Sequence, residues 1–210
     1  MSRLAAILRL AVATGITVAV IATFADTASR VPINPFNFFG YFTTQSNLLT
    51  AIVYFVTAGV ILRGGVQPPW LAIARASVTT YMIIVGIVYA VLLAPLGAAG
   101  GVPLPWANTV LHIIVPIYVV ADWLLFADRP ALSFRSFWVV LVFPVLWVAV
   151  VLVRGATDGW FPYPFLDPAL GYGTIALYCV GIAIAVIVVG AAVWGLSRVR
   201  LGSVESNRKP

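Results

Sequence analysis

The sequence has little charge, one cysteine and one histidine, and each of these shortages excludes a class of protein. Only 9% of its 210 residues are charged and 62% are hydrophobic, whereas a typical soluble domain is about a quarter charged. This balance excludes a disordered tail, a nucleic-acid-binding module and an ordinary cytosolic enzyme. The single Cys179 excludes an internal disulfide and a cysteine-based zinc site, and the single His112 excludes bis-histidine haem ligation and an HExxH metalloprotease site. We expect no metal, no organic cofactor and no nucleic-acid partner.

What the sequence has instead is long apolar runs. A membrane-spanning helix needs about 20 apolar residues, and six stretches are long enough. They predict an all-α, polytopic membrane protein with a single six-helix domain over residues 1–196 and a short, flexible cytoplasmic tail at 197–210. The first run follows two arginines as a signal peptide would, but it is longer than the apolar core of a signal peptide, so we expect a retained helix. The expected spans are 5–25, 41–62, 72–95, 105–127, 136–154 and 172–196.

The basic residues predict how these helices are oriented. Of the 12 Arg and Lys residues, only Arg30 and Arg154 fall on the side opposite the N-terminus. The positive-inside rule therefore predicts that both termini are cytoplasmic and that the protein lies in a cell membrane. Arginine in place of lysine, together with the many alanines and valines, suggests a bacterial inner membrane. The loops expected outside are 26–40, 96–104 and 155–171, and two of them are rich in aromatic residues and proline, which favour the headgroup region.

Two of the expected spans carry a stripe of polar residues, and these residues are the candidates for function. A polar side chain in hydrocarbon is costly unless it is partnered, so such stripes face the interior of a helix bundle. We interpret the lower part of the first stripe, from Thr50 on, as interhelical hydrogen-bonding residues. The first stripe is Thr43, Asn47, Thr50, Tyr54 and Thr57, at spacings of 4, 3, 4 and 3, and the second is Asn108, His112 and Asp122.

The outer ends of both stripes bring reactive groups to a similar depth. Thr43 and His112 differ in depth by about one helical turn, at roughly 1.5 Å per residue. A hydroxyl, an imidazole and amide donors at one level can supply a nucleophile, a base and an oxyanion site. The alternative is a structural histidine whose hydrogen bonds are satisfied within the bundle. Thr44, Asn47 and Asn108 are the accompanying candidates, and Asn108 suits an interhelical hydrogen bond equally well.

Asp122 lies too deep to join this group. It is roughly 15 Å below His112 by helical rise, which is too far for a direct triad contact. Because a buried carboxylate needs a cation, we expect a structural ion pair of Asp122 with Arg75 or Arg9 near the inner leaflet.

Three short segments resemble the androgen-induced membrane hydrolase family, whose members are multi-pass proteins that cleave fatty acid esters of hydroxy fatty acids. The segments are Gly40-Tyr41-Phe42-Thr43-Thr44-Gln45-Ser46-Asn47, then Trp106-Ala107-Asn108-Thr109-Val110-Leu111-His112, and Trp160 followed by Tyr163-Pro164-Phe165-Leu166-Asp167. The resemblance implies Thr43 as the nucleophile and His112 as its partner, and it adds Tyr163 and Asp167 to the candidate substrate-binding residues. The sequence is most similar to actinobacterial six-helix relatives. It departs from the animal members in the apolar residues 113–116 after the histidine, and Thr44 offers a second hydroxyl beside Thr43.

The expected function is therefore hydrolysis of a lipid ester inside the membrane. Thr43 would attack the ester carbonyl, and His112 would accept the hydroxyl proton and return it to the leaving alcohol. The expected partners are the bilayer and a membrane lipid or fatty acyl ester. The alternative is a non-catalytic protein that binds or transports a lipid or small molecule through the same cavity, and a third interpretation is a structural partner subunit.

Overall fold

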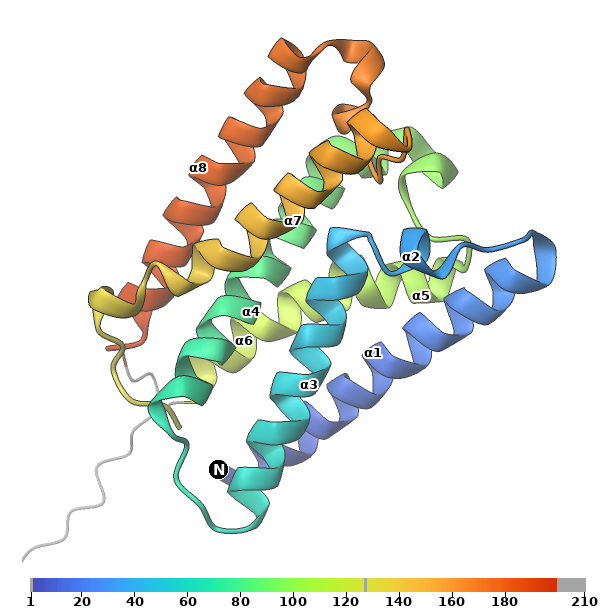
Figure 1. Cartoon of the computed structure of the whole chain (residues 1–210). Helices are drawn as coiled ribbons and strands as arrows, with labels where there is room; N and C mark the ends of the chain where they lie inside the picture. Colours follow the sequence, from blue (N-terminus) through green and yellow to red (C-terminus); the bar gives the residue numbers. More distant parts are fainter. Residues whose placement is uncertain (1, 127, 200–210) are drawn as a thin grey trace, which may run out of the picture.

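The chain folds into a bundle of helices, and the computed structural model describes residues 2–126 and 128–199 (Figure 1). No strand occurs within the described residues, which confirms the expected all-α class. The long helices are α1 (Ser2–Arg30), α3 (Phe42–Leu62), α4 (Pro69–Val88), α6 (Val115–Leu125), α7 (Val139–Thr157) and α8 (Tyr172–Leu196). The shorter elements are α2 (Pro35–Phe38), η1 (Tyr89–Leu93), η2 (Ala94–Gly100), α5 (Pro105–Thr109), η3 (Val110–Ile114), η4 (Phe134–Ser136), η5 (Pro164–Leu166) and η6 (Pro168–Leu170).

Within the part of the chain that the structure describes, six helical segments are long and apolar enough to cross a membrane, so the protein is a multi-pass membrane protein. The first is longer than expected from the sequence, because α1 continues through an Asp26–Arg30 pair at i and i+4, which stabilises its last turn. Of the expected tail at 197–210, residues 200–210 lie outside the described residues, as does Ala127 at the end of the fourth expected span. The six segments are Arg3–Arg30, Phe42–Leu62, Pro69–Gly97, Pro105–Leu125, Phe134–Thr157 and Tyr172–Leu196.

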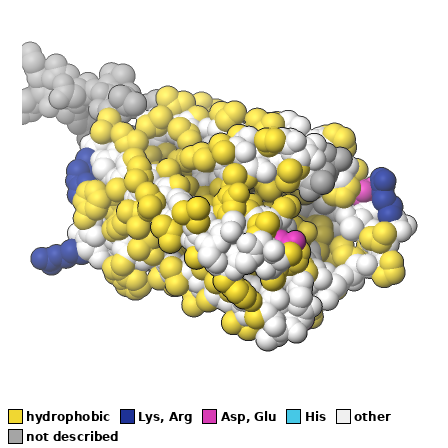
Figure 2. Space-filling model, turned by 90° about the horizontal axis from the view of Figure 1, so that it is seen from above, with side chains coloured by type: hydrophobic (Ala, Val, Ile, Leu, Met, Phe, Trp, Pro, Cys, Tyr) yellow, Lys and Arg dark blue, Asp and Glu magenta, His cyan; other side chains and the backbone are white. Residues whose placement is uncertain are grey.

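Helix α4 lies at the centre of the bundle and packs against α3, α6, α7 and α8. Helix α1 packs along α3, while α7 and α8 lie on the other side of α4 (Figure 1). Many side chains of α7 and α8 are apolar and exposed, as expected of helices that face lipid. Figure 2 shows hydrophobic side chains over the middle of the molecule and Lys or Arg side chains at its two ends.

The two ends of the bundle differ in composition, and we name them by it. The aromatic end consists of the connections 31–41, 94–104 and 158–171, and the arginine end consists of the connections 63–68 and 126–138. The positive-inside prediction would place the arginine end in the cytoplasm.

A proline inside α7 shows how the bundle compensates for a broken helical hydrogen bond. Pro144 has no N–H, so it cannot donate to the carbonyl of Val140 one turn earlier. The hydroxyl of Tyr81, from α4, donates to that carbonyl oxygen instead, at 3.1 Å. The substitute bond therefore joins α7 to the central helix.

Candidate functional site

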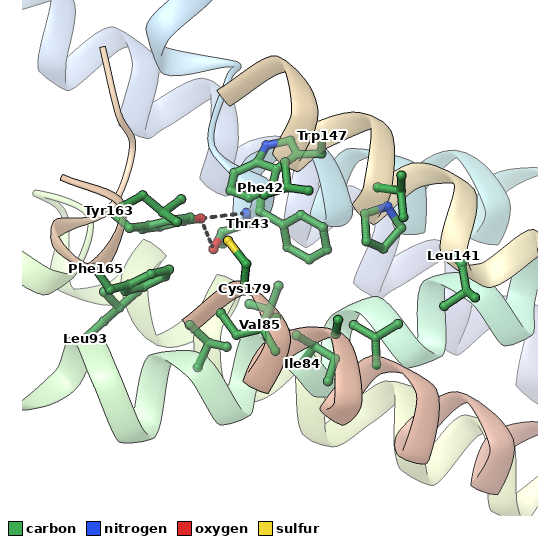
Figure 3. A pocket seen from close by; sticks show the side chains of 18 residues that line it. Phe42, Thr43, Ile84, Val85, Leu93, Leu141, Trp147, Tyr163, Phe165 and Cys179 are labelled. Carbon is green, nitrogen blue, oxygen red and sulfur yellow. Dashed lines mark hydrogen bonds between the residues drawn. The ribbon is translucent and has the colours of Figure 1, made fainter. Parts of the chain in front are cut away.

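Thr43 is the second residue of α3, at the aromatic end, and it is almost completely buried. Its backbone N–H donates to the hydroxyl oxygen of Tyr163 at 3.2 Å, and its Oγ1 lies 3.3 Å from the same oxygen (Figure 3). Tyr163 comes from the connection 158–171, so the last long loop of the chain folds back over the start of α3. Sequence reasoning placed both residues in the site but did not predict this direct contact.

The hydroxyl of Tyr163 stays protonated at neutral pH. Burial raises the pKa of Tyr163 to about 12, although the hydrogen bonds with Thr43 act in the opposite direction. Tyr163 therefore places a neutral O–H group beside the hydroxyl of Thr43. The positive end of the α3 helix dipole lies at the same point, because Thr43 is in the first turn of this helix.

His112 lies in η3, a single turn of π-helix, and its side chain is buried. Its ring stacks on Tyr89 with the ring centroids 4.4 Å apart. Its Nδ1 is 3.3 Å from the backbone oxygen of Asn108. Because a carbonyl oxygen only accepts, this bond requires the proton on Nδ1 and leaves a lone pair on Nε2. That is the tautomer that a general base needs.

The π-turn that carries His112 is produced by the proline that follows it. Pro116 has no N–H, and the N–H of Val115 donates to Val110 five residues back. The carbonyl of Leu111 is therefore released from the helix, and the side-chain amide of Asn47 donates to it at 3.3 Å. The same pattern occurs in η1, where Ala94, the residue before Pro95, donates to Tyr89. Turns of this kind are frequent at functional sites.

Asn47 connects the backbone of Thr43 with the π-turn that carries His112. Its amide nitrogen also donates to the carbonyl of Thr43, at 2.9 Å, so one buried side chain contacts both Thr43 and Leu111, the neighbour of His112. Sequence reasoning proposed Asn47 as an oxyanion donor, whereas its amide N–H groups are directed at these two backbone carbonyls. Its position makes it a positioning residue.

The other polar candidates have local partners. Asn108 accepts from the N–H of Val102 at 3.2 Å and donates to the hydroxyl of Tyr89 at 2.6 Å, so its side chain fixes the connection before α5. The carboxylate of Asp167 accepts the N–H of Ala169 at 2.8 Å and caps η6. Thr44, in contrast, lines the same cavity as Thr43 and His112.

Two cavities meet at Thr43 and Tyr163, and their walls differ in polarity. The polar cavity, of about 390 Å³, is lined by Thr43, His112 and Tyr163 and by side chains of α1 and of the aromatic-end connections. The apolar cavity, of about 130 Å³, lies among α3, α4, α7 and α8 and is lined mostly by aliphatic and aromatic side chains (Figure 3). Thr43 and Tyr163 border both cavities. The arrangement can present one hydroxyl to a molecule that has an apolar and a polar part.

No protein-family model, no curated protein and no solved structure matches the chain. Support for roles of Thr43, His112 and Tyr163 therefore comes from their geometry and chemistry. The structure places Thr43 and His112 on one cavity wall, and the side-chain hydrogen bond of Thr43 among the described residues is with Tyr163.

A second polar cluster lies at the arginine end and has a different character. The structure brings Asp122 together with both candidate arginines, at 2.7 Å from Arg9 Nε and 2.8 Å from Arg75 Nη2. Asp128 completes the cluster, because it pairs with Arg9 and, at 2.9 Å, with Arg75. Gln67 donates to Asp128 at 2.8 Å and accepts from Arg75 at 3.0 Å.

Sequence reasoning missed Asp128 and Gln67, because both lie in connections, outside the polar stripes of the expected spans. The available signal was the number of buried charges, because the single carboxylate of Asp122 cannot neutralise two buried arginines. The hydrogen bonds and charges of Arg9 and Arg75 outweigh the effect of burial, which alone would raise the pKa of Asp128, and they lower this pKa to about 2. The four charged groups therefore balance to zero.

Proposed function

We propose that this protein is an intramembrane hydrolase of lipid esters, with Thr43 as the nucleophile and His112 as the general base. The observation that carries the proposal is that Thr43 lies between an apolar and a polar cavity and shares the wall of the polar cavity with His112. An ester lipid is likewise divided by polarity, with an apolar acyl chain on one side of its carbonyl and an alcohol on the other. Fatty acid esters of hydroxy fatty acids are the class of such esters that the sequence resemblance implies.

The reaction follows from the groups in place. When an ester binds, the Thr43 hydroxyl turns from Tyr163 toward His112, as catalytic hydrogen bonds often tighten only in the complex. Thr43 Oγ attacks the ester carbonyl carbon while its proton passes to Nε2 of His112. The negative charge that develops on the carbonyl oxygen is stabilised by the O–H of Tyr163 and by the N-terminus of α3.

Collapse of this intermediate breaks the bond to the alcohol oxygen, which receives the proton from His112. The acyl group is then held as an ester of Thr43. Water from the polar cavity attacks this ester with His112 again accepting a proton, and the fatty acid leaves as the threonine hydroxyl is restored. If the arginine end is cytoplasmic, this water comes from the outer face.

Buried side chains between the site and Asp122 support hydrolysis rather than transport through the bundle. The hydroxyls of Thr50 and Thr57 donate to carbonyls of their own helix, at 2.7 Å in each case. Met82, Val115 and Val119 are buried in the core of the same region. Non-catalytic lipid binding would use the same cavities and is separated from hydrolysis by experiment.

The test is to remove each reactive group. Thr43→Ala and His112→Ala are each expected to lower lipid-ester hydrolysis by at least about 10²–10⁴-fold without unfolding the protein. The double variant should be little worse than either single variant, because residues that act as one unit are not additive. A fluorophosphonate probe should label the wild type and fail to label Thr43→Ala.

Thr44→Ala is the matched control, because Thr44 is the neighbouring hydroxyl on the same cavity. If labelling persists in Thr43→Ala and disappears in Thr44→Ala, Thr44 is the nucleophile. If the wild type takes no probe and cleaves no ester, the proposal is wrong and the non-catalytic alternative, lipid binding or transport, becomes the better interpretation.

A further inference from the structure

We infer that the apolar cavity beside Thr43 binds the acyl chain, and that the chain enters it sideways from the bilayer between α7 and α8. The inference rests on the proposed ester hydrolysis and adds to it the direction of entry and the orientation of the substrate.

The first argument is the position of the opening. Val145 of α7 and Ala183 of α8 both line the apolar cavity, and both are exposed on the surface of the bundle. Each lies near the middle of its apolar segment, Phe134–Thr157 and Tyr172–Leu196. A cavity that reaches the surface at this depth opens to hydrocarbon rather than to water.

The second argument is the distribution of polar groups in the cavity. The hydroxyls of Thr43 and Tyr163 lie at one side, beside the polar cavity (Figure 3). The α7 and α8 walls consist of aliphatic and aromatic side chains and the thiol of Cys179. Water is poorly held by such walls, because it needs two to four polar partners. An acyl chain satisfies them, and its ester carbonyl then meets the two hydroxyls.

The third argument is size. The cavity of about 130 Å³ is close to the roughly 150 Å³ of an engineered apolar cavity that binds benzene. It therefore holds about the first six carbons of the chain next to the carbonyl. The rest of a longer chain extends through the opening into the bilayer, which costs little because the chain stays in an apolar medium. The alcohol side of the ester then lies in the polar cavity, with its leaving oxygen near His112.

The inference is tested by closing the opening. Ala183→Phe places a ring at the entrance, and Val188→Phe adds a ring at an exposed position of the same helix that does not line the cavity. The substrates are 4-methylumbelliferyl esters of acetate, butyrate, octanoate and palmitate. The octanoate-to-acetate ratio of kcat/KM is expected to fall at least tenfold in Ala183→Phe and to stay at the wild-type value in Val188→Phe. An unchanged ratio in Ala183→Phe would overturn the inference.

A second measurement does not depend on hydrolysis. A diazirine-bearing palmitic acid is photolysed with the protein in phosphatidylglycerol nanodiscs, and the cross-linked peptides are mapped by mass spectrometry. Cross-links are expected at 145–148 and 179–186, with at least fivefold fewer in Ala183→Phe than in Val188→Phe. Equal cross-linking in the two variants refutes the acyl site. Localised cross-links in a wild type that cleaves no ester keep the acyl site and refute the hydrolase.

Discussion

The two ends of the bundle hold their polar groups in opposite ways. At the arginine end, Arg9, Arg75 and Asp122 are all but inaccessible to solvent, and each is joined to the others or to Asp128 by short charged hydrogen bonds. At the aromatic end, Thr43 and His112 are also buried, but both line the polar cavity. Polar groups that satisfy one another hold helices together, whereas polar groups left beside a cavity can act on a ligand.

The largest predicted effect is on stability and comes from the arginine end. Asp122→Asn removes one charge from a balanced cluster and leaves the positive charge of two buried arginines facing a single Asp128. We expect the free energy of unfolding to fall by about 3–5 kcal/mol, the usual effect of breaking a buried pair. Thermal unfolding in detergent measures this loss, and Asp158→Asn, in the exposed pair with Arg154, is the control that should leave the melting temperature nearly unchanged. Equal shifts in the two variants would show that the cluster is solvated.

The next effect is on catalysis and comes from the aromatic end. Tyr163→Phe removes the O–H beside Thr43, and kcat for ester hydrolysis should fall by about 10²-fold, as when an oxyanion donor is lost. KM should change little, because the ring still forms the wall of both cavities. Since the pKa of Tyr163 is raised to about 12, ionisation of this hydroxyl should not reduce wild-type activity up to about pH 10. Full kcat in Tyr163→Phe would exclude the hydroxyl from the mechanism.

A smaller loss of stability is expected when acid protonates Asp128 at the arginine end. The pKa of Asp128 is about 2 in the folded chain against 3.8 for a free carboxyl. A lowered pKa contributes stability that is present above about pH 4 and is lost as the pH falls toward 2. The loss should amount to about 2 kcal/mol, measured as the melting temperature between pH 5 and pH 2. Asp128→Asn should be less stable at pH 5 and less sensitive to acid, and a wild-type slope in this variant would contradict the assignment.

The smallest predicted effect distinguishes a residue that positions the catalytic groups from a residue that only stabilises the fold. Asn47 and Tyr81 each donate to a carbonyl that a proline has released, but only Asn47 contacts Thr43. Asn47→Ala and Tyr81→Phe should each destabilise the fold by about 1–2 kcal/mol, because a buried acceptor loses its partner. Only Asn47→Ala should also lower kcat, by about tenfold, and change the pH dependence of kcat/KM through His112. Parallel losses of activity in both variants would mean that Asn47 acts through stability alone.

The sequence predicted what depends on local pattern. Apolar runs located the six spans, helical spacing placed Thr43 and Asn47 on one buried face, and the cost of a buried charge indicated the arginine partners of Asp122. It did not predict the π-turn at His112, because a bond to the fifth residue back does not follow the helical period. The nearby Pro116 was the available signal.

Other features depend on how distant segments of the chain are arranged in space. The apolar cavity beside Thr43 is lined by side chains of α3, α4, α7 and α8 and of the loop 158–171, and no local pattern of residues records how these segments meet. The contact of Tyr163 with Thr43 joins positions 120 residues apart and depends on the path of a loop. Asp128 was missed for the same reason, since its connection turns inward instead of toward solvent.

The charge balance of the arginine cluster also constrains how the protein is made. Ribosomes synthesise Arg9 first and Arg75 next, so two like charges reach the membrane before either carboxylate exists. Both arginines lie within about two turns of the start of their helices, where insertion costs less than the roughly 2.5–3.5 kcal/mol of a central arginine, but two like charges close together still repel each other. Arg9 of α1 and Arg75 of α4 therefore share a neutralising carboxylate only after α6, which carries Asp122, has been synthesised. Because α6 follows α1 and α4 in the chain, the packing of α6 is the last step of assembly in this half of the bundle. A polypeptide truncated before α6 lacks Asp122, the carboxylate that pairs with both Arg9 and Arg75.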